Sequence, residues 1–137
     1  MNSVFESIKV ATKLIDMEKH VGEHPRIGAT DVVPFVPVSG VTMQECVELA
    51  KRLGKKVGEE LGIPVFLYEE AATKPENRNL ADVRKGEYEG LKVKMNKPDF
   101  GPAEMHPTAG AVVIGARKYL VAFNVNLTTP DVEIAKK

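Results

Sequence analysis

The sequence predicts an α+β fold built around a mixed β-sheet. Apolar residues recur at helical intervals near the N-terminus and again over residues 42–61. Short β-rich segments lie at 31–38 and 64–68, and two more lie between residues 111 and 127. The strand–helix–strand order of the first two favours parallel strands, whereas the short connection between the last two favours an antiparallel pair.

The first element is a helix predicted from Val4 to Lys19. Ser3 and Glu6 have the spacing of a capping box, which satisfies two amides at the start of a helix. Apolar residues then recur at helical intervals, at Val4, Ile8, Ala11 and Ile15. The pair at 21–22, Val-Gly, ends the pattern.

A strand is predicted next, over residues 31–38. Its apolar alternation is weak, and it contains Pro34 and Pro37. Each proline removes a backbone donor from the ladder, so this strand is expected at an edge of the sheet or with irregular pairing.

A second helix is predicted over residues 42–61. Thr42 and Glu45 form another capping box, and Gly62 with Pro64 closes the helix. Its apolar stripe consists of Met43, Val47, Ala50, Leu53, Val57 and Leu61. The single cysteine, Cys46, lies in this pattern and is expected to be a small buried apolar residue.

The segment after this helix is predicted as a short apolar strand, 64–68, followed by a polar region. If 31–38 and 64–68 lie parallel in one sheet, their connection is a right-handed crossover. Residues 69–100 are rich in Lys, Glu, Asn and Pro and are expected to be mostly loop, with a short helix near 80–85.

The C-terminal part is predicted to contain a hairpin and a helix. Residues 111–114 and 119–127 are β-rich and are joined by four residues, which is typical of an antiparallel hairpin. Pro130 then occupies the first position of a last helix that runs to Lys137.

Composition places the chain among ordinary globular domains. Its 137 residues fit a single domain, 1–137, with 43% hydrophobic and 28% charged residues. Nineteen basic and nineteen acidic residues cancel, so neither nucleic acid nor an anionic membrane is an expected partner.

No apolar stretch is long enough to span a bilayer and no secretory signal is evident, so the cytoplasm is the predicted location. Three histidines and one cysteine, His20, His24, His106 and Cys46, lack metal-ligand spacing, so no metal is predicted.

The segment 22–31, GEHPRIGATD, is the strongest candidate for a functional turn. Pro25 drives His24 into an extended conformation, and Gly28 permits a sharp bend or the close approach of another segment. Imidazole is the commonest general base near neutral pH, so His24 is a candidate catalyst. A surface or capping role for this histidine is the alternative.

The sequence of this turn and of the residues that follow it resembles that of a known protein family. Residues 22–37, GEHPRIGATDVVPFVP, resemble the signature of the glutamate formiminotransferases, the folate enzymes of histidine breakdown. Further segments resemble the family in the family's order: 41–50, 61–70, 79–90, 98–110 and 115–127. The similarity runs from Ser3 to about Val132.

The resemblance implies a reaction and a catalytic residue. Family members transfer a formimino group from N-formimino-L-glutamate to tetrahydrofolate, which is a co-substrate. Their catalytic histidine lies in a Gly-Glu-His-Pro-Arg run that matches His24, and an aspartate from an upstream strand orients the site. Arg26 is a candidate partner for a substrate carboxylate. Its alternative role is a local salt bridge to Asp31 or Glu23.

A second family segment implies the folate site. The matching residues are Gly101, Pro102, Ala103, Glu104, Met105, His106, Pro107, Thr108, Ala109 and Gly110. A loop bounded by glycine and proline can bring backbone amides close to a flat pteridine ring. A purely structural connection is the alternative. If the family roles hold, His24 and this loop line one groove.

The resemblance also bears on architecture and partners. The family subdomain is a ferredoxin-like sheet, so a partial ferredoxin-like mixed sheet is expected, with helices packed mainly on one face. Family members carry strands before the segment matching Ser3 and a second subdomain after Pro130. An uncovered sheet edge would favour a homo-oligomer or a complementary subunit. Folate and formiminoglutamate are the implied small-molecule partners.

The main functional hypothesis is a formiminotransferase. The alternative is a non-catalytic folate- or partner-binding module, or a remnant of a split formiminotransferase.

Overall fold

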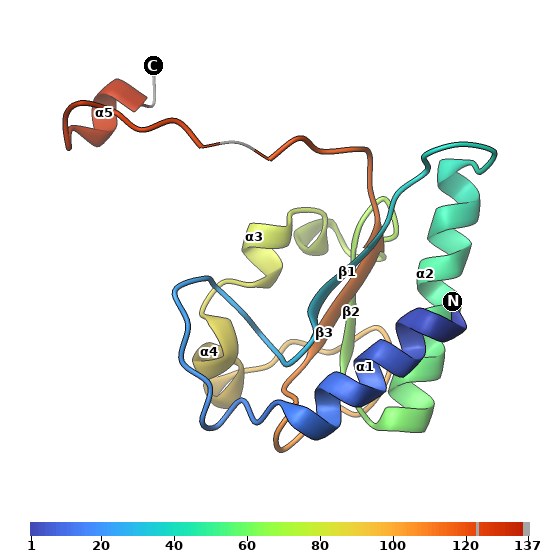
Figure 1. Cartoon of the computed structure of the whole chain (residues 1–137). Coiled ribbons are helices and arrows are strands. Elements are labelled where there is room, and N and C mark those ends of the chain that lie inside the picture. The colour runs from blue at the N-terminus through green and yellow to red at the C-terminus, as the bar shows by residue number, and fades with distance from the viewer. Residues whose placement is uncertain (123, 136–137) are drawn as a thin grey trace.

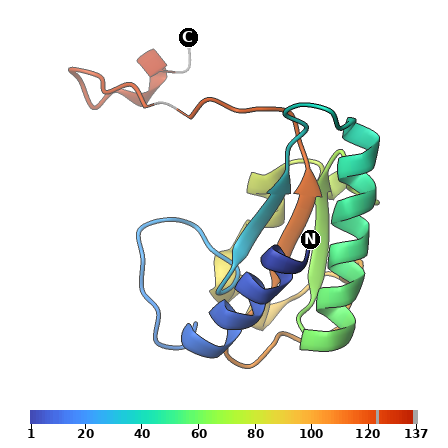
Figure 2. The same cartoon turned by 45° about the vertical axis from the view of Figure 1, so that its right-hand side comes forward.

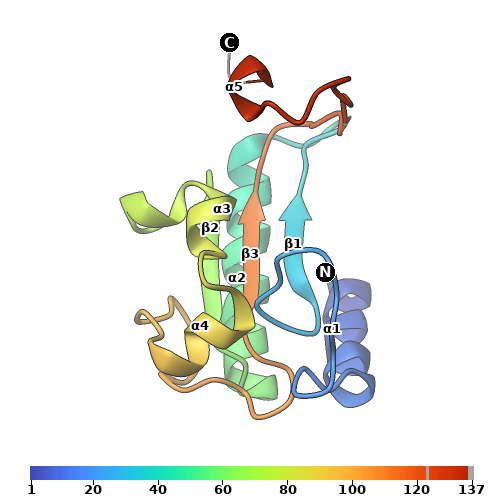
Figure 3. The ribbon, with the colours of Figure 1, turned by 90° about the vertical axis from the view of Figure 1, so that its left-hand side faces the viewer.

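A three-stranded β-sheet forms the centre of the structure. The computed structural model describes residues 1–122 and 124–135. The strands are β1 (Asp31–Phe35), β2 (Val65–Glu69) and β3 (Val112–Ala116), and they lie parallel in the order β1-β3-β2. Figure 3 shows β3 between its two neighbours. Antiparallel pairing occurs as isolated bridges such as Gly28–Gly110 and Val65–Phe100. The small sheet with its helices confirms the predicted α+β class.

Helices cover both faces of this sheet (Figure 2). The two longest, α1 (Asn2–Leu14) and α2 (Met43–Leu61), pack with the side chains of one face into the larger core. The short α3 (Leu80–Val83) and α4 (Glu87–Val93) pack with the opposite face, together with the segment that contains Ile27. The helix α5 (Val132–Ala135) lies away from the sheet (Figure 1).

The helix α2 confirms its sequence prediction. Thr42 and Glu45 form the complete capping box, and Gly62 ends the helix in the left-handed region at φ 64°. Cys46 is buried, as predicted, and the inward stripe includes Ala50, Leu53 and Val57, which have no exposed surface. Because this stripe packs on β3 and β2, the helix supports the centre of the sheet.

The helix α1 begins earlier and ends earlier than predicted. The capping box at Ser3 and Glu6 does not form, since Met1 is the N-cap and Ser3 lies inside the helix. The helix ends at Leu14 rather than Lys19. Asp16 accepts a hydrogen bond from the Glu18 amide at 3.0 Å, which starts a separate turn that competes with further helix.

The strand β1 is an edge strand, as its prolines predicted, but it ends at Phe35 instead of 38. The predicted hairpin of 111–114 and 119–127 is wrong. β3 pairs in parallel with β1 on one side and β2 on the other, so both of its edges are already occupied. Residues 119–122 and 124–127 are consequently not strands, and residue 123 lies outside the described residues.

The polar region after β2 holds more helix than predicted. A 3₁₀ turn, Pro75–Asn77, precedes α3, which matches the short helix expected near 80–85. The helix α4 was not predicted. At the C-terminus, α5 begins at Val132, two residues after Pro130, with the Asp131 carboxylate accepting from the Glu133 amide at 3.0 Å. The predicted extension to residues 136–137 lies outside the described residues.

Candidate active site

The histidine-bearing turn, 22–31, is called the first motif and the loop 101–110 the second motif. The two motifs meet through their backbones. Gly28 and Gly110 form an antiparallel bridge. The Ala29 amide donates to the Ala109 carbonyl at 2.9 Å, and the Met17 amide donates to the Thr108 carbonyl at 2.8 Å. A Cβ added at Gly28 would lie 1.9 Å from the Ala111 carbonyl oxygen. The close approach that the sequence predicted at Gly28 is therefore confirmed.

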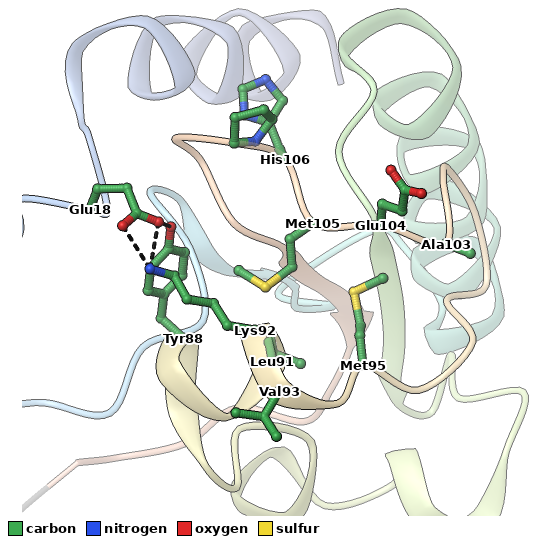
Figure 4. A pocket seen from close by; sticks show the side chains of 11 residues that line it. Glu18, Tyr88, Leu91, Lys92, Val93, Met95, Ala103, Glu104, Met105 and His106 are labelled. Atoms are coloured by element: carbon green, nitrogen blue, oxygen red, sulfur yellow. Dashed lines mark hydrogen bonds and ion pairs between the residues drawn. The ribbon is translucent and has the colours of Figure 1, made fainter.

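A surface cavity of about 430 Å³ lies beside the second motif. Figure 4 shows its side chains, which come from α4, the loop after it, the second motif and the turn after α1. The lining residues are Glu18, Tyr88, Leu91, Lys92, Val93, Met95, Ala103, Glu104, Met105, His106 and Pro107. The side chains of Leu91, Met95 and Met105 form an apolar, polarisable wall of this cavity. Such a wall suits a flat aromatic ring.

One side of the cavity is a hydrogen-bonded group of three side chains. The Tyr88 hydroxyl donates to Glu18 Oε1 at 2.6 Å, and Lys92 Nζ lies 2.6 Å from the same oxygen (Figure 4). Hydrogen bonds from Lys92 and Tyr88 lower the pKa of Glu18. Burial, together with the neighbouring carboxylate, raises the pKa of Tyr88 to about 12. At neutral pH this group is therefore a carboxylate held by an ammonium and a phenol.

His106 faces the cavity from the second motif. Its Nδ1 accepts hydrogen bonds from the Ala109 amide at 3.0 Å and the Thr108 amide at 3.3 Å. Burial lowers the pKa of this imidazole, so the ring is neutral at pH 7. Because Nδ1 is an acceptor, the proton of the neutral ring lies on Nε2. The loop thus supplies a fixed hydrogen-bond donor beside an apolar wall.

The predicted catalytic residue lies outside this cavity. His24 is exposed, in the irregular segment between α1 and β1. Its neighbour Pro25 lines a second cavity, of about 470 Å³, together with residues of α3 and the start of α4. The backbone brings the two motifs together, but the imidazole of His24 is not among the groups that line the first cavity.

Arg26, the predicted substrate-binding arginine, is engaged in an internal ion-pair network. Its guanidinium donates to Glu89 through two nitrogens, at 2.8 and 2.9 Å, and to Glu87 at 3.1 Å. The local partners expected from the sequence, Asp31 and Glu23, are not the ones that it contacts. A substrate carboxylate at this position would have to replace one of the two glutamates.

The predicted folate loop, 101–110, divides into a cavity-lining centre and anchoring ends. Its central residues, 103–107, line the cavity. Gly101 and Gly110 have positive φ values of 84° and 68°, where a side chain would be strained and would also collide with backbone carbonyls of Ile63 and Ile27. Pro102 is exposed, whereas residues 108–110 bind the segment before β1.

Several lining residues were not selected from the sequence. Tyr88, Leu91 and Met95 stand at intervals of three and four, which is a helical pattern. Gly90 interrupts that pattern, and the region was expected to be mostly loop because it is rich in Lys, Glu, Asn and Pro. No local sequence pattern marks Glu18 as a site residue, because only the tertiary fold brings it next to the other residues that line the cavity.

Two further properties concern the residues that the structure describes. Among residues 1–122 and 124–135, no group of three His, Cys, Asp or Glu side chains is arranged to hold a metal ion. Within the same residues, no helix combines the length and the apolar character needed to cross a membrane.

Comparison with known proteins gives consistent matches. A glutamate formimidoyltransferase from Streptococcus pyogenes serotype M1 is 54% identical over 139 residues, covering 98% of this chain and 46% of the relative. A formimidoyltransferase-cyclodeaminase from Dictyostelium discoideum is 56% identical over 131 residues, covering 93% of this chain and 24% of the relative. A glutamate formimidoyltransferase from Thermoplasma acidophilum is 51% identical over 143 residues, covering 100% of this chain and 47% of the relative.

The chain spans less than half the length of these curated relatives. A family comparison agrees with them: residues 1–117 match the formiminotransferase domain, N-terminal subdomain. That match includes both sequence motifs and the whole sheet. The chain therefore belongs to the formiminotransferase N-terminal subdomain family.

Proposed function

We propose that this chain contributes the catalytic histidine and the pterin-binding wall of a glutamate formimidoyltransferase. The observation that carries the proposal is the cavity beside the second motif. It combines methionine and leucine side chains with a fixed imidazole donor and the Glu18–Tyr88–Lys92 group. A flat ring system with a polar edge, such as the pteridine of tetrahydrofolate, matches this combination. The names of the relatives support the same activity.

The proposed reaction needs one group that first accepts and then donates a proton. A ring nitrogen of tetrahydrofolate attacks the amidine carbon of N-formimino-L-glutamate, and the proton that leaves the attacking nitrogen goes to His24. The tetrahedral intermediate collapses when the same imidazole protonates the nitrogen of glutamate, which departs with the bonding electron pair. Imidazole is the side chain that most often accepts and then returns a proton near neutral pH, so one histidine can serve both steps.

The position of His24 implies that other segments of the enzyme complete the site. The imidazole is exposed and lies outside the cavity of the second motif. Transfer requires both substrates to be held within about 3–3.5 Å of one another. We therefore expect the 137-residue chain by itself to show little or no transfer. Self-association or a complementary subunit, in the cytoplasm, is part of the same proposal.

The test is a chimaera in which this chain replaces the matching segment of the Streptococcus pyogenes relative. His24→Ala in the chimaera is expected to lower kcat by about 10²- to 10⁴-fold, the usual contribution of a general acid–base group. Affinity for a tetrahydrofolate analogue, measured by calorimetry, should change far less, because the imidazole acts on protons in the transition state.

The matched control is His20→Ala, an exposed histidine of the same segment whose backbone carbonyl, and not its ring, contacts Arg26. It should leave kcat near the parent value. A chimaera that keeps full turnover with His24→Ala would overturn the catalytic role. Met105→Ala is expected to weaken binding of the folate analogue, and unchanged binding would overturn the placement of the pterin.

A further inference from the structure

The turn that carries His24 is held by hydrogen bonds from other segments of the chain. Residues 21–25 are exposed and belong to neither helix nor strand. On the C-terminal side of the histidine, the Pro25 carbonyl accepts a hydrogen bond from the Arg84 guanidinium. The next carbonyl, that of Arg26, accepts from the Tyr88 amide at 2.8 Å. Contacts from outside the turn therefore set its shape.

Arg84 connects this turn to the start of β1. It is the C-cap residue of α3, and its Nη2 lies 3.1 Å from Asp31 Oδ2 while it also contacts the Pro25 carbonyl. The two side chains are largely buried, with 21% and 23% of their surface exposed. An ion pair that is partly removed from water is screened less by salt than one on the surface.

Asp31 closes the turn from the other end. Its Oδ1 accepts the Ile27 amide at 2.9 Å, so the carboxylate binds the arginine and the backbone together. Asp31 adopts this position with φ at 62°, in the left-handed region. Strained residues of this kind persist only where the surroundings hold them in place, and they cluster at functional sites.

We infer that Asp31 and Arg84 are positioning residues that orient the turn of His24 for proton transfer. The inference rests on the proposed function, since it assigns a purpose to the turn only if His24 is the acid–base group. The Arg84 guanidinium binds the carbonyl of Pro25, the residue after His24, and it also binds the Asp31 carboxylate. That carboxylate in turn accepts the Ile27 amide. Loss of the pair frees both contacts at once, and an ångström of misplacement at a reacting group can lower a rate by about 10²-fold.

Two substitutions separate this role from general stability. Asp31→Asn keeps an oxygen for the Ile27 amide and a residue that tolerates a positive φ, but it removes the charge that Arg84 binds. Arg84→Gln removes the guanidinium. Lys85→Gln is the control, because it alters an exposed cation next in sequence to Arg84. Arg84→Lys restores the charge without the planar guanidinium, whose Nη2 contacts both the Pro25 carbonyl and Asp31.

The first measurement is hydrogen exchange of backbone amides in the 137-residue chain. In Asp31→Asn and in Arg84→Gln, the Ile27 amide should exchange at least about tenfold faster, since a hydrogen bond to a charged acceptor is worth a factor of that order. The amide of Val113, in the centre of β3, should keep its parent rate. The double variant should match the single ones, because both remove the same interaction. Unchanged exchange at Ile27 in both variants would overturn the inference.

The second measurement is steady-state kinetics in the chimaera. Both substitutions should lower kcat by about 10- to 10²-fold with KM for either substrate within about twofold, and Arg84→Lys should restore part of the loss. An equal loss in kcat with Lys85→Gln, or a change confined to KM, would overturn the positioning role. Full turnover with His24→Ala would instead overturn the proposed function, and the exchange data would still decide whether the contact holds the turn.

Discussion

Gly28→Ala should be the most damaging small substitution in the region where the two motifs meet. No positive φ accounts for glycine at this position, so the cost comes from space alone. A methyl group there would lie 1.9 Å from the Ala111 carbonyl oxygen and 2.5 Å from that of Ala109. Both atoms belong to backbone, which cannot rotate away as a side chain can.

The magnitude follows from the shift that is required. Contacts below 3.0 Å essentially never occur for a real Cβ, so the segments must separate by more than 1 Å. That shift breaks two backbone hydrogen bonds, from the Ala29 amide at 2.9 Å and from the Ala111 amide at 3.0 Å. Each buried polar group left without a partner costs about 1–3 kcal/mol. We expect a loss of about 3–4 kcal/mol, a large part of the 5–15 kcal/mol by which domains are typically stable.

The assay is urea unfolding followed by circular dichroism, with Gly90→Ala as the matched control. Gly90 lies in α4, and its nearest contact for an added Cβ is 3.9 Å away. The same chemical change there should stabilise the protein by about 0.5–1 kcal/mol, because alanine is the better helix former. A Gly28→Ala protein within about 1 kcal/mol of the parent would refute the reasoning, since it would mean that the two segments are not held at this distance.

Two further predictions concern acid stability and assembly. Hydrogen bonding to Arg26 lowers the pKa of Glu89 from 4.5 to about 2, so the stability from this pair is present above pH 4.5 and is lost as the pH falls towards 2. Glu89→Gln should flatten the acid unfolding curve in that window, Glu59→Gln should not, and equal curves for the two would contradict the assignment. Self-association should appear in sedimentation equilibrium at high micromolar concentration, because β1 is an edge strand and the side chains at 119–121 are 62–76% exposed. A compact monomer under those conditions would contradict it.

The sequence predicted elements whose signals are local. The capping box at Thr42, the stripe of α2 and its terminal glycine act within a few residues of one another, and the structure has all of them. Pro34 likewise excluded a central position for β1, because a proline lacks the donor that the ladder needs. These predictions depend on covalent geometry and helical periodicity, and neither depends on distant parts of the chain.

The errors occurred where distant segments compete. β3 has the composition of a hairpin strand, but β1 and β2 occupy both of its edges, so no edge remained for residues 119–127. The helix α1 ended early because Asp16 binds a nearby amide and Met17 donates to the Thr108 carbonyl. Pairing of this kind depends on which segments the fold brings together, and no local pattern contains that information.

The candidate site divides in the same way. The sequence by itself determined the family, the histidine-bearing turn and the loop at 101–110, because these are contiguous motifs whose glycines and prolines constrain the backbone. Only the tertiary structure decided that Glu18, Tyr88 and Lys92 share a cavity with His106, that Arg26 binds glutamates of α4, and that Asp31 and Arg84 close the turn. Those groups lie far apart along the chain, and their hydrogen bonds and ion pairs form only when packing on the sheet brings them within about 3 Å.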